Sequence, residues 1–279
     1  MAARSSVTPS SLADLISQVE TALVTAGWTV VVAGTPNILG CVADADGCRT
    51  YMSLKDNGAG NIEMTVSPLL NDAGTDHHTY EVLIRETTYS GSAWHLYCYT
   101  DFFMLRRGTA VNNYHLFAGL YKPIPGAFYT GYRYRTVFGG THNSAFTLLN
   151  LRWTLYGRNA SGKYRFSGPA GSSAAGSFVV MASCKMSATG TYVNLAVGND
   201  LAGGLKFCLP GIIISSEAND VVPGKNGIIG YISHLITVIS GPALNASDTV
   251  TIDTVQYELN PDKVQYWDYY VDLFLLWEV

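Results

Sequence analysis

Residues 12–23 carry a helical pattern of apolar positions. Apolar side chains recur there three and four positions apart, at Leu12, Leu15, Ile16, Val19, Ala22 and Leu23. Thr8 or Ser10 can cap the start of this helix, with Pro9 near its first turn. Gly27 can end it in a left-handed conformation. The pattern therefore predicts an amphipathic helix that leads into a first strand over residues 29–33.

After this helix, short β-rich runs alternate with turn residues, which is typical of antiparallel sheets. Asp46-Gly47 predicts a hairpin turn, and residues 56–60 predict another. The expected strands are 48–55, 61–66, 81–86, 94–100, 114–120, 153–156, 163–166, 191–197, 205–209, 230–239 and 248–258. We expect a mainly β protein, an antiparallel β-sandwich or barrel-like fold with one N-terminal amphipathic helix.

Two stretches, 123–150 and 167–177, show weak periodicity and are expected to be irregular. We place a boundary near residue 125, which gives a region 1–125 with the helix and hairpins and a β-rich region 126–279. A single domain is the alternative.

The last sixteen residues are strongly aromatic. Their aromatic side chains are Tyr266, Trp267, Tyr269, Tyr270, Phe274 and Trp277. Chain ends fray unless something holds them, and aromatic surface is costly to leave in water. The segment is interpreted as a final core strand, with a tail that docks on a neighbouring subunit as the alternative.

Charge is scarce and unevenly placed. Of the 279 residues, 14% are charged, where about 25% is typical; the aromatic content excludes intrinsic disorder. Residues 1–101, 102–199 and 200–279 carry net charges of −7, +10 and −7, which give the overall −4, and the middle span has no acidic residue. Such sorting indicates a partner surface, which could belong to nucleic acid, an anionic glycan or another copy of the chain.

The five cysteines (Cys41, Cys48, Cys98, Cys184 and Cys208) are odd in number and form no CxxC pair. We expect free thiols in a protein made in a reducing compartment, although Cys41 and Cys48 could bridge a hairpin. Neither a secretory signal peptide nor a membrane-spanning run is expected.

Motifs for catalysis or metal binding are weak. Asp72, Asp76, His77 and His78 cluster without a zinc spacing, so a surface loop is preferred. Asp44 and Asp46 resemble the start of a calcium loop, but Lys55 stands at the twelfth position. Neither a nucleophile elbow nor a phosphate-binding loop is found. We expect no catalytic residue, cofactor or metal.

Residues 132–135 alternate Tyr and Arg, a composition that suits single-stranded nucleic acid. On a strand, however, the two residue types would face opposite sides, and the pI of about 5.8 is low for a dedicated binder. Nucleic acid is therefore disfavoured as a partner. The preferred interpretation packs the tyrosines inward and places the arginines at a surface or interface.

Three features resemble structural proteins of tailed-bacteriophage virions. They are the helix that runs into Ala26-Gly27-Trp28, the segment 114–125 with its Gly-Leu-Tyr-Lys-Pro-Ile-Pro ending, and the hairpin that starts at Trp153. The composition, poor in charge and rich in Gly, Ser and Thr, agrees with these features. The resemblance implies a non-enzymatic protein located in the virion, made in the host cytoplasm without secretion. It would form a ring or multimer in the tail, neck or baseplate, or decorate the capsid.

The expected partners are other copies of the chain and other virion proteins, with a host surface glycan as a further possibility and no membrane. Interface cores favour Arg and aromatic residues. The candidate interface residues are Arg106, Arg107, Arg133, Arg135, Arg152, Tyr266, Trp267, Tyr270, Phe274 and Trp277. Alternative functions are a carbohydrate- or receptor-binding β-sandwich and a depolymerase that accompanies a phage tail.

Overall fold

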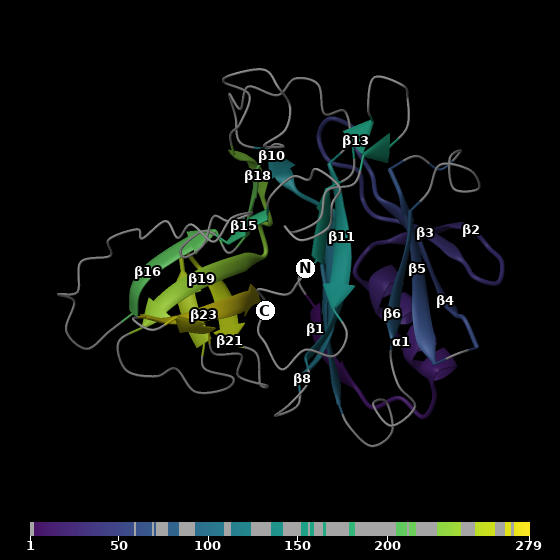
Figure 1. Ribbon diagram of the computed structural model, residues 1–279, viewed down its shortest axis with the longest axis horizontal. Helices are drawn as coiled ribbons and strands as arrows, with labels where there is room; N and C mark the ends of the chain where they lie inside the picture. Colours follow the sequence, from purple (N-terminus) through teal and green to yellow (C-terminus); the bar gives the residue numbers. More distant parts are fainter. Residues whose placement is uncertain are drawn as a thin grey trace. The chain divides into compact units, whose positions relative to one another are not determined.

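The protein is mainly β, as a computed structural model shows (Figure 1). The structure describes residues 3–58, 60–68, 70, 78–83, 93–108, 113–123, 135–141, 152–155, 157–158, 164–165, 179–181, 205–210, 212–215, 228–240, 249–259, 266–268 and 271–279. Within them, one helix accompanies strands that all pair in antiparallel fashion. The expected fold class is thereby confirmed.

The chain divides into two compact units. Unit 1 comprises Met1–Leu120, Tyr132–Phe146 and Asn150–Arg165, and unit 2 comprises Tyr121–Gly131, Thr147–Leu149 and Phe166–Val279. The boundary expected near residue 125 lies in the first passage into unit 2. The chain then returns to unit 1, so the two units are interleaved in sequence.

Unit 1 contains two larger sheets and a short hairpin. The first sheet has the order β1 (Ala3–Val7), β7 (Trp94–Cys98), β8 (Phe102–Gly108), β9 (Asn113–Leu120), β11 (Thr136–Thr141) and β12 (Arg152–Leu155). The second has the order β2 (Thr29–Val32), β3 (Ile38–Gly40), β4 (Tyr51–Asp56), β5 (Asn61–Ser67) and β6 (His78–Leu83). The hairpin is β13 (Gly157–Arg158) with β14 (Tyr164–Arg165).

The N-cap of helix α1 (Leu12–Thr25) lies one residue after Ser10, the nearest expected cap. Ser11, rather than Thr8 or Ser10, is the N-cap, and its Oγ accepts a hydrogen bond from the Asp14 amide at 3.1 Å. Ser10 instead donates from its backbone N and its Oγ to the Asp14 carboxylate, at 2.7 and 2.9 Å. The bond to Ser11 satisfies an amide that the first helical turn leaves free, and the bonds from Ser10 hold the chain that enters the helix.

The expected end of the helix at Gly27 is confirmed. Gly27 has φ +106°; its amide donates to the Val24 carbonyl, and the Trp28 amide donates to the Leu23 carbonyl, both at 3.0 Å. This is the Schellman arrangement, in which a residue of positive φ closes the last turn. It also brings Trp28 beside Leu23 in the core, and both side chains are buried.

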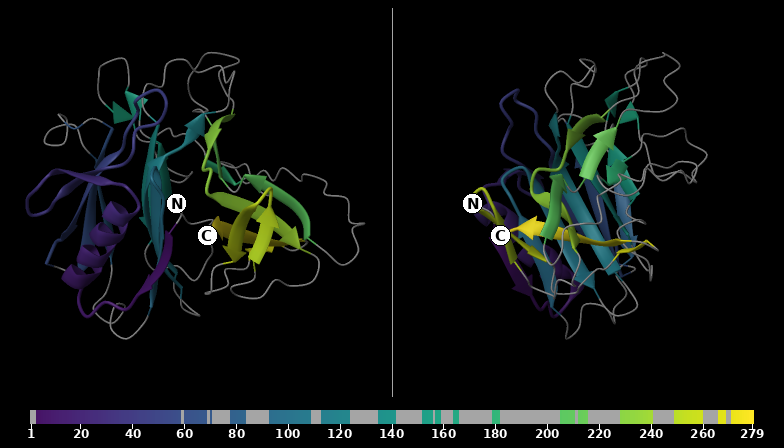
Figure 2. Two further views of the ribbon diagram at one scale, coloured as in Figure 1. Left: turned by 180° about the vertical axis from the view of Figure 1, so that it is seen from behind. Right: turned by 90° about the vertical axis from the view of Figure 1, so that its left-hand side faces the viewer.

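The two larger sheets of unit 1 share one hydrophobic core with α1 (Figure 2). The helix contributes Leu15, Val19 and Leu23 and contacts both β4 and β7. Trp28 lies edge-on to Phe103 of β8, with ring centroids 6.1 Å apart, and its indole N–H donates to the Tyr99 carbonyl at 2.8 Å. The apolar face of α1 therefore packs into the core that the two sheets share.

Strands β7 and β8 are buried on both faces, which explains why the sequence pattern missed β8. Leu105 faces the shared core, while Met104 and Arg106 face the opposite side and are equally buried. A strand buried on both sides has no alternation of apolar and polar residues to detect. β11 was also missed, because it lies in the segment 123–150 that was expected to be irregular.

Unit 2 contains two sheets. One has the order β10 (Lys122–Pro123), β18 (Ile228–Tyr231), β17 (Ile212–Ser215) and β15 (Val179–Met181). The other has the order β16 (Leu205–Pro210), β19 (Leu235–Ser240), β23 (Val271–Glu278), β21 (Val255–Leu259) and β20 (Thr249–Ile252), with β22 (Tyr266–Asp268) also paired to β23.

Three expected elements are divided differently in the structure. The expected strand 248–258 is a hairpin of β20 and β21, in which Asp253 and Thr254 turn the chain with φ of 47° and 72°. The expected strand 230–239 is split between β18 and β19. β12 pairs with β11, so the expected hairpin of 153–156 with 163–166 is replaced by β13 and β14. The expected strand 191–197 lies outside the described residues.

The interpretation of the C-terminus as a final strand of the fold is confirmed. β23 lies between β19 and β21, and the Val279 amide donates to the Gln256 carbonyl at 2.9 Å. The end of the chain is therefore held by neighbours in its own sheet.

Candidate functional site

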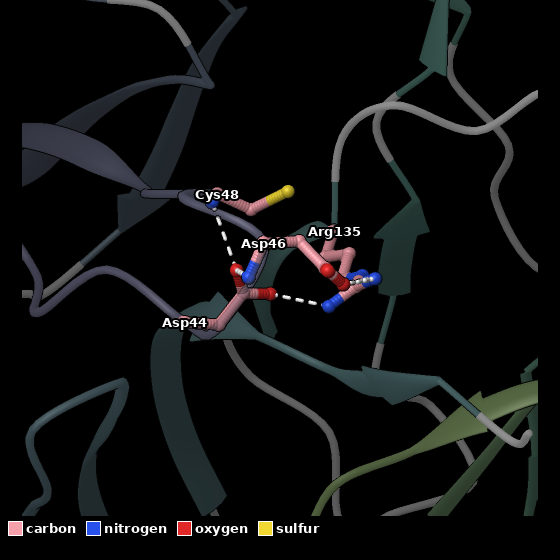
Figure 3. A network of polar contacts seen from close by, with 4 residues as sticks. All are labelled: Asp44, Asp46, Cys48 and Arg135. Atoms are coloured by element: carbon pink, nitrogen blue, oxygen red, sulfur yellow. Dashed lines mark hydrogen bonds and ion pairs between the residues drawn. The ribbon is translucent and has the colours of Figure 1, made fainter.

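One polar cluster in the described residues joins Asp44, Asp46, Cys48 and Arg135 (Figure 3). Asp44, Asp46 and Cys48 lie in the loop between β3 and β4, and Arg135 directly precedes β11. An Arg135 guanidinium nitrogen lies 2.5 Å from Oδ2 of Asp44, and its other terminal nitrogen binds Oδ2 of Asp46. One cation therefore bridges two carboxylates.

Local hydrogen bonds explain why this loop presents both carboxylates. The Gly47 amide donates to the Asp44 carbonyl at 3.0 Å, which closes a β-turn. Oδ1 of Asp44 accepts hydrogen bonds from the amides of Asp46 and Cys48, each at 2.9 Å. Such capture of backbone amides is the property that places Asp in turns. The hairpin turn expected at Asp46-Gly47 is confirmed.

The electrostatics of the cluster favour a structural role. Partial burial opposes the charge on Arg135, but its hydrogen bond to Asp46 and the charge of Asp44 outweigh burial, so the pKa of Arg135 is raised. Burial, followed by the negative charge of Asp44, raises the pKa of the Cys48 thiol. A thiol with a raised pKa is a poor nucleophile, because the thiolate is the reactive form.

The carboxylates of Asp44 and Asp46, considered above as the start of a calcium loop, both face the Arg135 guanidinium. Hydrogen bonds from a guanidinium to carboxylates are charge-assisted and stronger than neutral ones. The arrangement can clamp the β3–β4 loop of one sheet to the start of β11 in the other. Sequence reasoning chose Arg135 as an interface residue and missed these partners, since no local signal connects positions so far apart.

Arg106 and Arg107, also expected at an interface, lie on β8 and are buried in the chain itself. Their residues are 1% and 6% exposed. The Arg107 guanidinium carbon lies 5.8 Å from the centroid of the Trp94 ring, a cation–π distance. Arg106 and Arg107 were expected at an interface, and the structure places both inside the chain. The cause of this placement is the burial of both faces of β8.

The remaining candidate interface residues are described only in part. Arg152 lies on β12, Tyr266 and Trp267 lie on β22, and Phe274 and Trp277 lie on β23. Phe274 is paired with Val238, and Trp277 with Leu235 and Glu258. Arg133 and Tyr270 lie outside the described residues.

A second polar contact, which sequence reasoning also missed, is buried inside unit 1. The Thr50 hydroxyl donates to the Gly119 carbonyl at 2.9 Å and shares a hydrogen bond of 2.9 Å with the Thr136 hydroxyl. Both threonines are fully buried. This contact joins the start of β4 to β9 and β11, so it connects the two sheets through their interior.

The described cysteine side chains are free thiols. Cys41 and Cys98 are buried and Cys48 is half-buried, which matches the expectation of free thiols and excludes the bridge between Cys41 and Cys48. Burial raises the pKa of Cys41 and of Cys98 to about 12.

In the described part of the chain, no group of three or more His, Cys, Asp or Glu side chains is placed to hold a metal ion. Asp72, Asp76 and His77 lie outside that part, as does the side chain of His78. Among the same residues, no helix has the length and apolar content needed to cross a membrane. The chain matches no model of a known protein family, and no curated protein is significantly similar to it.

Proposed function

We propose that this chain is a non-enzymatic structural protein of a tailed-bacteriophage virion that assembles as a ring or multimer in the tail, neck or baseplate. The observation that carries the proposal is the composition, in which 14% of residues are charged and 12% are aromatic. Surfaces covered by neighbours are depleted of charge and enriched in aromatic residues. The resemblance of the N-terminal helix, the segment 114–125 and the Trp153 hairpin to virion proteins supports the same function.

The described surface agrees with a protein whose partners are other protein subunits. Its exposed large apolar side chains are four valines, Val24, Val30, Val32 and Val42. Exposed apolar surface favours association when it is gathered in one region. The paired Arg135 and the buried Arg106 and Arg107 place three of the basic residues of the middle span inside the chain.

The alternative of a carbohydrate-binding module predicts several exposed aromatic rings along one rim. Among the residues whose side chains are described, the exposed large apolar residues are all valines. The described surface therefore does not favour a stacking site for sugars.

The proposal is tested by measuring the mass of the purified full chain in solution. Light scattering after size-exclusion chromatography, over a hundredfold range of concentration, is expected to give multiples of 30.1 kDa. Electron microscopy of the native source, with the chain detected in purified particles, tests the location. A chain that stays at 30.1 kDa throughout and is missing from particles would contradict the proposal.

A further inference from the structure

The four exposed valines belong to one uncharged stretch of the chain. From Thr21 to Ala43 the sequence contains no Asp, Glu, Lys, Arg or His. Val24, Val30, Val32 and Val42 are between 43% and 47% exposed, and all four lie in this stretch. Exposed apolar side chains in an uncharged segment of the chain are candidates for a contact site.

Two of these valines lie on a strand at the edge of a sheet. β2 is the first strand in the order β2-β3-β4-β5-β6, and β3 is its one strand neighbour in the described part of the chain (Figure 1). An edge strand directs a row of backbone N–H and C=O groups away from its neighbour, where they can pair with another strand. Val30 and Val32 are exposed along this edge at 46% and 43%.

β2 has few of the features that protect edge strands. Its sequence is Thr-Val-Val-Val, which combines high strand propensity with no charge and no proline. Its protective features are its length of four residues and a register shift between Val30 and Val32 against β3. Natural edge strands that must stay free usually carry an inward-pointing charge, most often Lys.

The distribution of charge along the chain favours one kind of partner for the β2 edge. The whole chain has a net charge of −4, so two copies repel each other at long range. Two identical copies also bring each charge near its own symmetry mate in a two-fold contact. The uncharged stretch 21–43 is therefore a region where two copies can approach without repulsion, whereas it offers nothing to a charged partner.

We propose that β2 is a self-association edge, at which Thr29–Val32 of two copies pair in antiparallel fashion about a two-fold axis. The two five-stranded sheets would then continue into one another. This inference rests on the proposed function and names the surface that the proposed assembly uses. A pair of four-residue strands buries less than the roughly 1,200 Å² of a stable interface, so the contact is weak alone and is strengthened by the other contacts of a multimer.

The test compares two double variants that add the same charge to two different edge strands. Val30→Lys/Val32→Lys places two lysines on β2. Thr249→Lys/Thr251→Lys places two lysines on β20, the edge strand of a unit 2 sheet, where both threonines are exposed. Association is measured by sedimentation velocity over a wide range of concentration, and circular dichroism checks the fold of each variant.

We expect the wild type and the Thr249→Lys/Thr251→Lys variant to associate with the same dissociation constant. The Val30→Lys/Val32→Lys variant is expected to associate at least tenfold more weakly. If this variant associates as the wild type does, the β2 edge is excluded while the proposed assembly stands. A wild type that is monomeric at every concentration contradicts the proposed assembly and the edge together.

Hydrogen exchange on the unmodified chain keeps the inference testable if the lysine variant fails to fold. Amides of residues 29–32 are expected to exchange more slowly as the concentration of the wild type rises, and amides of residues 249–252 are expected to be unaffected. Association without added protection at residues 29–32 overturns the inference.

Discussion

Arg135 and Asp44 are 91 positions apart in the sequence, and their side chains meet at 2.5 Å. The contact pairs the basic middle span with the acidic first third inside one unit. Basic and acidic residues that are separated along the sequence therefore partly meet in the fold. They do so because β11, which follows Arg135, pairs with β9 inside unit 1. The −7, +10, −7 pattern therefore does not by itself describe a surface offered to a partner.

Removal of the Arg135 side chain should loosen the β3–β4 loop. Arg135→Ala is expected to lower the free energy of unfolding by about 1 kcal/mol, because two charge-assisted hydrogen bonds are lost. The bond to the half-buried Asp44 contributes most, since solvent screens the exposed carboxylate of Asp46. Arg135→Lys should lose an intermediate amount, since one ammonium cannot bridge both carboxylates as a guanidinium does. Urea unfolding followed by tryptophan fluorescence measures both changes.

The matched control for Arg135 is Lys55→Ala, which removes the same charge from an exposed position on β4. It should change the free energy of unfolding by less than about 0.5 kcal/mol. Equal effects of Arg135→Ala and Lys55→Ala would show that the clamp contributes nothing beyond net charge.

The hydroxyl of Thr50 should matter more than that of Thr136. Thr50→Val keeps the shape but removes the donor to the Gly119 carbonyl, and is expected to cost about 1–3 kcal/mol. Thr136→Val leaves that donor in place, so its cost should be smaller. The double variant should lose less than the sum of the two, because both single changes break the same hydrogen bond. Denaturant unfolding of the three variants checks this order.

Gly119 lies where a side chain has no room. A Cβ there would lie 2.4 Å from the Asp101 carbonyl oxygen and 2.5 Å from the Phe102 Cα. Since both are backbone atoms, Gly119→Ala is expected to cost about 3 kcal/mol or more. Gly27→Ala is the control: its nearest contact would be an ordinary 3.6 Å, and only its positive φ is unfavourable, at about 1–2 kcal/mol. Thermal unfolding that ranks Gly27→Ala as the worse variant would contradict this account.

The buried thiols should resist alkylation in the folded protein. At pH 8 almost no thiolate forms at Cys41 or Cys98, whose pKa burial raises to about 12. Mass spectrometry after iodoacetamide treatment is expected to find both unmodified in native protein and modified in urea. Cys48 should react faster than either, because it is half-buried. Rapid native labelling of Cys98 would show that its strand opens.

The raised pKa of Cys41 and Cys98 predicts that the protein loses stability at alkaline pH. Their pKa rises from 9.0 in the unfolded chain to about 12 in the folded protein, so the folded state binds more protons between these values. Their contribution to stability is therefore complete below pH 9 and falls as the pH rises toward 12. A Cys98→Ala variant should show a shallower loss of stability over this range than the wild type.

The sequence by itself determined the features that depend on neighbours a few residues away. The apolar spacing of α1, its end at Gly27 and the turn at Asp44–Gly47 rest on hydrogen bonds and contacts within four or five positions. Antiparallel strands were predicted for the same reason, since alternation and turn residues are local. At the start of the helix the cap moved to Ser11, whose hydroxyl accepts the Asp14 amide, and the expected strands 230–239 and 248–258 were each divided in two.

Only the tertiary structure decided which of these elements meet. β8 could not be recognised from the sequence because both its faces are buried. Arg106 and Arg107 are buried for the same reason. The partners of Arg135, Thr50 and Trp28 lie between 69 and 91 positions away. Contacts at such separations form because the sheets close over one core, and no pattern within a short window contains that information.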